Sequence, residues 1–334
     1  MKDMEQKRWC MLIFLVSFLF IGLESVGSRG WIYAQEGKFP VKPIELVVPY
    51  APGGIVDLGS RVVTEALSRE LKVPVIVKNQ PGGGGLVAPT AYLTVKADGY
   101  SLLAGSSGAI ITTNLLSKTP AFDPRTTFLP VGFIADSPIA LSVPNASPFK
   151  SIADLVQFAK KNPGKLKGGV SSIGSENHIM FMSVLNDTKI DIKMIPYTAT
   201  GTLVTAILGE HVDWMTLTLP ATLPYAKSGG VRILALTKKS PELPGVPAGP
   251  AVGLPGFSST IWMGILVLPQ TPKAIYEKLV ATVQKVTQDP ETKKKLASLG
   301  FNVNYKGPQE FSNFLNDQWE NSSRIIKETG IKVN

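Results

Sequence analysis

The stretch Pro49-Tyr50-Ala51-Pro52-Gly53-Gly54-Ile55-Val56-Asp57 separates two different apolar patterns. Before it, residues 44–48 form a β-branched run that is typical of a buried strand. After it, Val63, Leu67 and Leu71 recur every four residues, which is the apolar stripe of an amphipathic helix. The stretch is therefore expected to hold the loop of a strand–loop–helix unit, and its prolines and glycines favour irregular backbone there.

This loop offers backbone donors to a ligand. Gly53 and Gly54 have no side chain, so we expect their N–H groups to be bare above the carboxyl end of the strand. The N-terminus of the following helix adds about half a positive charge, which favours a small carboxylate or phosphate. Asp57 has two interpretations: it is the N-cap of that helix, or it selects ligand hydroxyls or amines or orders waters.

Strands and helices alternate from residue 42 to about 105, with strands expected at 73–77 and 101–105 and a helix at 86–95. This alternation predicts a parallel sheet with right-handed crossovers. The glycine-rich run 79–85 is expected to be a flexible turn. No Gly-Lys-Ser/Thr follows it, as a phosphate-binding loop would require.

A second polar loop, Gly105-Ser106-Ser107-Gly108, ends the strand at 101–105. In an open α/β sheet, ligands bind outside the carboxyl ends of the strands, so this loop is expected at the same edge as Gly53 and Gly54. The two loops would then form a half site that is rich in amides and hydroxyls. The alternative is an ordinary strand-to-helix turn in which a serine caps the helix.

The rest of the chain repeats the alternation and ends in helices. Ser151 and Asp154 have the spacing of a capping box at a helix start. Residues 241–257 are rich in proline and glycine and predict a long irregular connection. We expect strands at 139–143, 168–171, 192–195, 212–216, 231–236 and 261–268, and helices at 151–160, 178–186, 202–208, 221–227, 272–288, 290–299 and 308–329.

The N-terminus has the features of a secretory signal. Basic residues precede the apolar run 9–23, and small residues follow it. Ala34 is the expected cleavage point and Gly27 a second one, while an uncleaved anchor is the alternative. Cleavage would remove Cys10, the only cysteine, so cysteine nucleophiles and thiolate metal sites are excluded from the mature protein.

The composition gives little indication of a nucleic-acid partner. The formal net charge is +9, but the 34 lysines and arginines are scattered along the chain. A nucleic-acid surface needs a basic stripe with interleaved aromatic residues, which is absent from the sequence. The positive balance is compatible with drawing in anionic ligands.

Few residues are suited to catalysis. The two histidines, His178 and His211, lie in separate elements without metal-binding spacing, and His211 is expected in a solvated turn. His178 is expected either inside a helix or against the ligand. The sequence has no G-x-S-x-G nucleophile motif, and nothing singles out a pair of carboxylates. The loops are therefore suited to holding an anion and not to transforming it. We expect neither a metal nor a cofactor.

The order of the motifs resembles the substrate-binding proteins of tripartite tricarboxylate transporters, the Bug family. Each motif is weak alone, but their combined order is specific and covers nearly the whole mature chain. The matching residues are Pro43-Ile44, Val48 to Gly54, Asp57, Arg61, Val75 to Val77, Asn79, Pro81-Gly82, Ala97 to Tyr100, Gly105 to Gly108, Asn162 to Leu166, Ile195 to Tyr197, Gly209, Val212-Asp213 and Gly253 to Phe257.

The resemblance implies an α/β type II periplasmic-binding-protein fold, in which two Rossmann-like lobes enclose a ligand cleft. It implies a first lobe of 35–140 plus 260–334, after the signal peptide expected at 1–34, and a second lobe of 141–259. The C-terminal segment would thus return to the first lobe. Members of this family generally capture small carboxylates for a membrane partner.

The resemblance also implies the residues of the site. The first lobe would hold one carboxylate through its two loops, and the second lobe would close over the rest of the ligand. The implied ligand-binding residues are Tyr50, Ala51, Pro52, Gly53, Gly54, Asp57, Ser106, Ser107, Gly108, Ser171, Ser172, Ser175, His178, Tyr197, Thr198 and Thr218.

The second lobe departs from the family pattern. Val170 stands where serine is common and Ser172 where glycine is common, and Thr198-Ala199 replaces the usual Lys-Gly. Leu217-Thr218 replaces the frequent Asp-Asn before Leu-Pro. These changes lead us to expect a ligand that is less polar at its far end than malate or citrate, such as an aromatic or branched acid.

The expected protein is thus a monomeric, exported, periplasmic binding protein. It would deliver a small organic carboxylate to the membrane subunits of a tripartite transporter and bind no nucleic acid. The first alternative is a sensor that presents its closed form to a receptor kinase. The second is a periplasmic enzyme that acts on a small acid, which the lack of a nucleophile disfavours.

Overall fold

The computed structural model describes residues 39–171, 173–197 and 199–331. The expected signal segment, with Ala34, Gly27 and Cys10, lies outside these residues, and so do Ser172 and Thr198. Within the chain from Lys42 onward, the described residues form one unit that is built on a mixed sheet.

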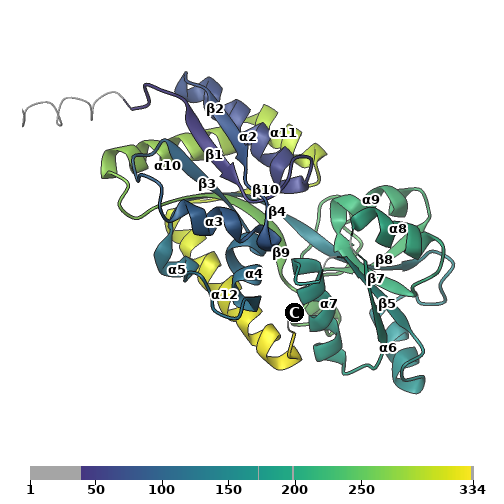
Figure 1. Cartoon of the computed structure of the whole chain (residues 1–334). Coiled ribbons are helices and arrows are strands. Elements are labelled where there is room, and N and C mark those ends of the chain that lie inside the picture. The colour runs from purple at the N-terminus through teal and green to yellow at the C-terminus, as the bar shows by residue number, and fades with distance from the viewer. Residues whose placement is uncertain (1–38, 172, 198, 332–334) are drawn as a thin grey trace, which may run out of the picture. The chain divides into compact units, whose positions relative to one another are not determined.

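The first part of this sheet begins with the strand that precedes the glycine loop. β1 (Ile44–Val48) pairs in parallel with both β2 (Val75–Asn79) and β3 (Ser101–Ser106). The helix α2 (Ile55–Leu71) connects β1 to β2 (Figure 1). The parallel arrangement confirms the prediction for this region. β2 begins two residues later than expected, because Pro74 has no N–H to contribute to the ladder.

One long strand, β4 (Leu129–Pro144), belongs to both parts of the sheet. Its first residues pair antiparallel with β9 (Thr260–Val267) and β10 (Asn302–Lys306). From Ile139 onward it pairs antiparallel with β7 (Trp214–Thr218) and β8 (Val231–Leu236). The prediction that this strand begins near 139 was wrong by ten residues. All but the first residue of β4 are buried, so the strand shows no alternation of apolar and polar positions.

The second part of the sheet has the order β4-β7-β5-β6. β5 (Lys167–Ser171) is parallel to β7 and to β6 (Lys193–Tyr197). The capping box at Ser151 and Asp154 is confirmed by reciprocal side-chain bonds. The strand β10 and a π-helical segment, η3 (Ser107–Thr112), were not anticipated. The other elements are η2 (Gly83–Gly85), α3 (Val87–Tyr92), α4 (Thr113–Leu116), α5 (Pro124–Thr127), α6 (Ile152–Lys161), α7 (Glu176–Thr188), α8 (Thr200–Leu208), α9 (Leu219–Lys227), η4 (Gly249–Val252), α10 (Lys273–Gln288), α11 (Pro290–Ser298) and α12 (Pro308–Thr329).

The core on each part of the sheet contains a close aromatic pair. On the first part, Trp262 and Phe311 meet edge to face with ring centroids 5.4 Å apart. On the second part, Phe181 stacks on Trp214 at 4.4 Å. Such pairs contribute about 0.5–1.5 kcal/mol each beyond the burial of their area. The C-terminal helix α12 contacts β4, η3 and α7, so the end of the chain packs on elements from both parts.

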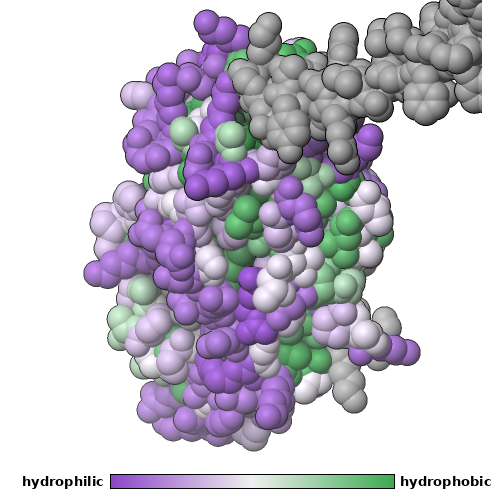
Figure 2. Space-filling view, turned by 90° about the vertical axis from the view of Figure 1, so that its left-hand side faces the viewer, coloured by the Kyte–Doolittle hydropathy of each residue, from purple (hydrophilic) through white to green (hydrophobic). Residues whose placement is uncertain are grey.

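Hydrophilic residues cover most of the face shown in Figure 2, and hydrophobic residues appear between them in smaller patches. Among the described residues, every helix is too short or too polar to cross a membrane.

Candidate functional site

The polar loops of the sequence lie at the carboxyl ends of neighbouring parallel strands. In the first part of the sheet, β1 and β3 are adjacent, and each ends in one of the two loops that are rich in glycine or serine. In the second part, Ser171 is the register partner of Tyr197, and β7 beside them ends at Thr218. Both parts of the sheet thus present their loops at the edge where α/β proteins bind ligands.

The loop that follows β1 (residues 49–54, the β1 loop) exposes its tip. Residues 51–54 are solvent-exposed, and Gly54 is the N-cap of α2. Gly53 has a φ of 88°, a conformation that strongly favours glycine. The interpretation of Asp57 as the N-cap was therefore wrong, since Asp57 is the third residue of the helix and the cap residue has no side-chain acceptor.

Asp57 instead holds the β1 loop in place. Its Oδ2 accepts the Gly53 N–H at 2.9 Å, and its Oδ1 accepts from Asn79 Nδ2 at 2.8 Å. Asn79 Nδ2 also donates to the Tyr50 carbonyl at 2.9 Å. Arg61 completes the network with two bonds of 3.0 Å to the carboxylate. The Asp57 side chain is 1% exposed and its oxygens are fully used, so it is not placed to select ligand groups.

The ionised form of Asp57 is favoured by this network. Burial opposes ionisation, but hydrogen bonds from Arg61, Asn79 and the Gly53 N–H, together with the Arg61 charge, outweigh it and lower the pKa of Asp57. The expectation that both glycine N–H groups are bare was wrong for Gly53, whose N–H is occupied by this carboxylate. The first backbone N–H groups of α2, from Gly54 onward, remain as the donors that a helix leaves without intrahelical partners.

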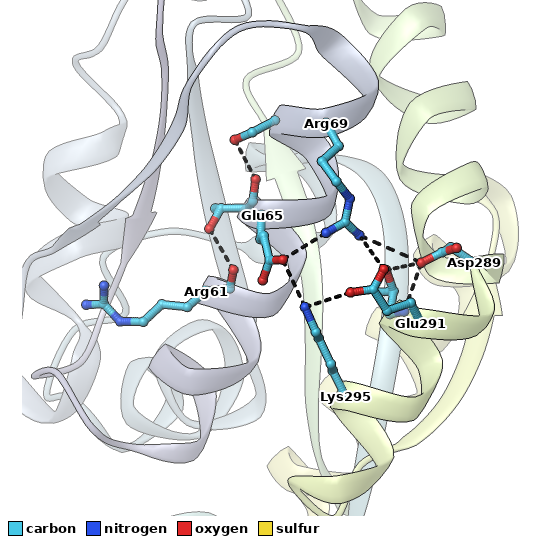
Figure 3. Close-up of polar contacts among 9 residues, drawn as sticks. Arg61, Glu65, Arg69, Asp289, Glu291 and Lys295 are labelled. Carbon is cyan, nitrogen blue, oxygen red and sulfur yellow. Dashed lines mark hydrogen bonds and ion pairs between the residues drawn. The ribbon is translucent and has the colours of Figure 1, made fainter.

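The body of α2 is fixed by ion pairs to α11 (Figure 3). Glu65 accepts from Arg69 at 2.8 Å and from Lys295 at 2.9 Å, and Lys295 also reaches Glu291 at 2.9 Å. The guanidinium of Arg61 points away from this cluster, in keeping with its bonds to Asp57. Each surface pair contributes little alone, but several linked pairs hold the helix that carries the β1 loop.

Tyr50 joins the β1 loop to the stretch where β3 ends and η3 begins (residues 105–108, the β3 loop). Its hydroxyl lies 3.1 Å from Ser106 Oγ. A Cβ added at Gly108 would lie 2.6 Å from Tyr50 Oη. Burial raises the pKa of Tyr50, while hydrogen bonding by Ser106 and the Ala109 backbone opposes the shift. Instead of an ordinary turn, the β3 loop leads directly into η3, and Ser107 Oγ is buried without a partner among the described residues.

The described residues of the loop after β5 (residues 171 and 173–175, the β5 loop) are held by hydroxyls of the loop itself. Ser175 caps α7, because its side chain accepts the His178 N–H at 3.3 Å while donating to the Ser171 carbonyl at 2.8 Å. Ser171 Oγ accepts from Asn177 Nδ2 at 3.1 Å. Ser175 therefore has a structural role, and Ser171 keeps its hydroxyl hydrogen for another acceptor.

His178 is buried and neutral. Its Nδ1 accepts the Gly174 N–H at 3.0 Å, which places the ring hydrogen on Nε2. The side chain is 4% exposed, and burial lowers its pKa. His178 lies inside a helix, where Gly174 holds it. Its Nε2–H has no partner among the described residues and is a donor that a ligand could use. His211 is exposed, as expected.

Tyr197 and Thr218 lie at the ends of β6 and β7. Tyr197 is half-buried and packs against the apolar cluster under α8, and Thr218 is half-buried at the start of α9. Leu217 and Thr218 stand at the two positions where the family often has Asp-Asn. Leu217 is fully buried, so the first of these positions is apolar here. Ser172 and Thr198, the other expected residues of this half, lie outside the described residues.

The helical segments that follow the loops, η3 and α7, contact each other through a pair of residues that were missed from the sequence. Thr112 Oγ1, at the end of η3, donates to Glu176 Oε2 at the start of α7 over 2.5 Å. Glu176 is 3% exposed, and burial raises its pKa although the neighbouring hydroxyls of Ser259 and Thr112 offset part of this. The available signal was its position: Glu176 directly follows the cap residue Ser175, where a helix start favours an acid.

The assembled groups can bind an anion by hydrogen bonds. They are backbone N–H groups of a helix start, serine and threonine hydroxyls and a neutral histidine, and none is an activated nucleophile. In the described ranges, no three His, Cys, Asp or Glu side chains are grouped so that they could hold a metal ion.

Comparisons with known proteins agree with this fold. The profile of the tripartite tricarboxylate transporter family receptor matches residues 60–331. Protein BugT of Bordetella pertussis is 28% identical over 322 residues, which are 96% of this chain and 98% of that protein. The solved structure of Rpa4515 from R. palustris with adipate is 29% identical, with a TM-score of 0.75 over 88% of this chain and 99% of that one. MatC from Rhodopseudomonas palustris with bound malate is 25% identical, with a TM-score of 0.72 over 86% and 100%.

The relatives have the same mixed α/β architecture of periplasmic binding proteins. The family profile covers most of the length of the sequence. The chain therefore belongs to the tripartite tricarboxylate transporter receptor family, a family of periplasmic solute-binding receptors and not of enzymes.

Proposed function

We propose that this protein is exported to the periplasm, where it captures a small organic carboxylate and delivers it to the membrane subunits of a tripartite transporter. The observation that supports the proposal is the Thr112–Glu176 bond, which joins the helical segments that follow the loops in the two parts of the sheet. Relatives of similar length have been solved with adipate and with malate, both small carboxylates.

The carboxylate would lie against the exposed tip of the β1 loop and the start of η3. Gly54 and the first N–H groups of α2 supply donors, and Ser106, Ser107 and Gly108 supply hydroxyls and backbone. Hydrogen bonds to an ionised acceptor are about twice as strong as neutral ones, so a few such donors are enough for firm binding. Ser171, His178, Tyr197 and Thr218 would complete the site from the other side, with the same role proposed for Ser172 and Thr198.

We further propose two lobes, 35–140 plus 260–334 and 141–259, that move relative to each other. The change of pairing partner along β4 supports a boundary close to this one, since its last pair with β9 is Pro138–Thr260 and its pairs with β7 and β8 begin at Ile139 and Ala140. Small-angle scattering tests this: addition of a ligand is expected to reduce the radius of gyration. An unchanged value at saturating ligand would contradict lobe closure.

The ligand itself is tested by native mass spectrometry of gently purified protein, followed by a thermal-shift screen of organic acids. A ligand that binds only the folded state at a hundredfold excess over its Kd stabilises the protein by about 2.7 kcal/mol. Carboxylates are expected to raise the midpoint, and matched amides are not. Acids with an apolar far end are expected to exceed malate and citrate, because Leu217 and Thr218 replace two polar residues common in the family.

The partner and the location need separate tests. N-terminal sequencing of the exported protein is expected to show cleavage at Ala34 or Gly27. Transport of the identified acid into vesicles that carry the membrane subunits is expected to require this protein. A protein that binds its acid but supports no uptake, and instead activates a receptor kinase, would establish the sensor alternative.

A further inference from the structure

Glu176 has an oxygen that nothing in the described part of the chain satisfies. Its Oε2 accepts from Thr112 at 2.5 Å, but its Oε1 is buried without a hydrogen-bond partner. The bond to Thr112 directs the carboxyl toward η3, which begins at Ser107 and Gly108. A buried acceptor without a donor is unfavourable, so a donor that arrives from outside the chain would bind strongly there.

The neighbouring residue adds a second acceptor. Asn177 Nδ2 is used on Ser171 Oγ at 3.1 Å, whereas Asn177 Oδ1 is buried and has no partner among the described residues. On the η3 side, Ser107 Oγ is also buried and unpartnered. The two contacting segments, η3 and the first turn of α7, thus both carry buried polar atoms without a partner among the described residues.

The groups beside Glu176 also leave its charge without a counter-charge. The groups that offset its burial are the hydroxyls of Ser259 and Thr112, and no lysine or arginine of the described residues contributes. The Ser259 hydroxyl lies 2.7 Å from Gln318 Oε1, which is a better-placed acceptor for its hydrogen. Burial raises the pKa of Glu176 and so disfavours its ionised form, which a cation that the ligand brings would stabilise.

We propose that Glu176 is a specificity-determining residue, whose free oxygen accepts a hydrogen bond from a donor group that the ligand carries beside its carboxylate. This inference rests on the proposed function, because it assumes that the ligand is a carboxylate. An ammonium group satisfies both the free acceptor and the missing counter-charge. A hydroxyl satisfies the acceptor alone. We therefore expect the protein to bind 2-amino or 2-hydroxy acids more tightly than acids that lack such a group.

The test compares ligands that differ only in this group. Isothermal titration with 4-methylpentanoate, 2-hydroxy-4-methylpentanoate and leucine keeps one apolar skeleton, and succinate, malate and aspartate form a second series. In the better-binding series, the donor-bearing acids are expected to bind about ten- to a hundredfold more tightly than the plain acid. Equal affinities within both series would overturn the inference.

Substitution of Glu176 separates the two donors. Glu176→Gln keeps the size and one carbonyl acceptor, so it is expected to abolish the preference for the amino acid and to retain most of the preference for the hydroxy acid. Glu176→Ala is expected to abolish both preferences while plain acids still bind. If both variants weaken all the acids equally, Glu176 is only structural.

A matched control and a folding control keep the outcome clear. Glu310, an exposed acid in the first turn of α12, receives the same change, and Glu310→Gln is expected to leave all affinities unchanged. Circular dichroism and the unfolding midpoint of each unliganded variant show whether it folds. If the wild type binds no acid from either series or from the wider screen, the proposed function fails. If acids bind without a preference that depends on Glu176, only this inference fails.

Discussion

The Gly53 N–H donates to Asp57 Oδ2 over 2.9 Å, so the glycine loop is held by a residue of the helix that follows it. The same carboxylate accepts from Arg61 and Asn79, and Asn79 in turn holds the Tyr50 carbonyl. A loop that is ordered before the ligand arrives loses less entropy on binding. In the proposed site, the buried acid would thus order the loop without touching the ligand.

Asp57→Asn should therefore weaken both the fold and the site. The substitution removes the negative charge from bonds made by Arg61, Asn79 and Gly53, and bonds to charged groups contribute about 1.5–3 kcal/mol. We expect the free energy of unfolding to fall by about 2 kcal/mol and the affinity for the carboxylate to fall with it. Denaturant unfolding and calorimetric titration measure the two effects.

Asp123→Asn is the matched control for that change. Asp123 also pairs with an arginine, Arg125, at 2.7 Å, but this pair is partly exposed and lies at the start of α5. Asparagine remains a good N-cap, so the loss is expected to stay below about 1 kcal/mol, with unchanged affinity. If Asp57→Asn bound ligand as tightly as the wild type, the loop would not need this restraint.

The contribution of Asp57 should also depend on pH. Its pKa is lowered in the folded state, so the folded form holds its proton less tightly than the unfolded form does. The stabilisation is present above the unfolded value near 3.8 and is lost as the pH falls through the lower folded value. The difference in unfolding free energy between wild type and Asp57→Asn should be constant from pH 7 to 5 and shrink toward pH 3. A difference that grew on acidification would contradict this assignment.

Local patterns were sufficient to predict β1, α2, the strand at 231–236 and the last helix, because each has a regular apolar period or a proline at its start. The start of β4 was missed because Gly132, Asp136 and Pro138 resemble loop residues, and burial of the strand on both faces removes its period. The predicted loops lie at the predicted strand ends, but their satisfied and unsatisfied groups depend on partners that are distant in sequence. Asn79 lies 22 residues from Asp57 and Thr112 lies 64 residues from Glu176, and no local pattern reports such pairs.

Gly108→Ala should interfere with the Tyr50 hydroxyl. A methyl group at this position would lie 2.6 Å from Tyr50 Oη, so either the ring or the β3 loop must move. Overpacking of this kind costs about 1–3 kcal/mol, and we expect a matching loss of ligand affinity. Adding Tyr50→Phe removes the obstructing oxygen and should recover most of the stability in chemical denaturation.

Gly201→Ala is the control for the glycine substitution. Gly201 lies in α8, and a methyl group added there would meet nothing within 4 Å, so alanine should stabilise the protein by up to about 1 kcal/mol. Its affinity for the ligand should match that of the wild type. If Gly108→Ala were equally harmless, Tyr50 would not be fixed where its bond to Ser106 places it.

His178 is expected to make the protein less stable in mild acid. Burial lowers its pKa below the ordinary 6.5, so the unfolded chain binds a proton at a pH where the folded chain does not. The stability of the wild type should therefore decline as the pH falls from about 6.5 through the lower folded pKa. His178→Asn places an amide oxygen where Nδ1 accepts the Gly174 N–H and cannot be protonated. Its unfolding free energy should stay flat where that of the wild type declines. Parallel pH profiles of the unfolding free energy for the two proteins would show that His178 does not titrate in the assigned direction.

The same variant tests whether His178 contacts the ligand. In calorimetry at pH 7.5, His178→Asn should lose affinity if Nε2–H donates to the ligand and keep it if His178 only orders the β5 loop.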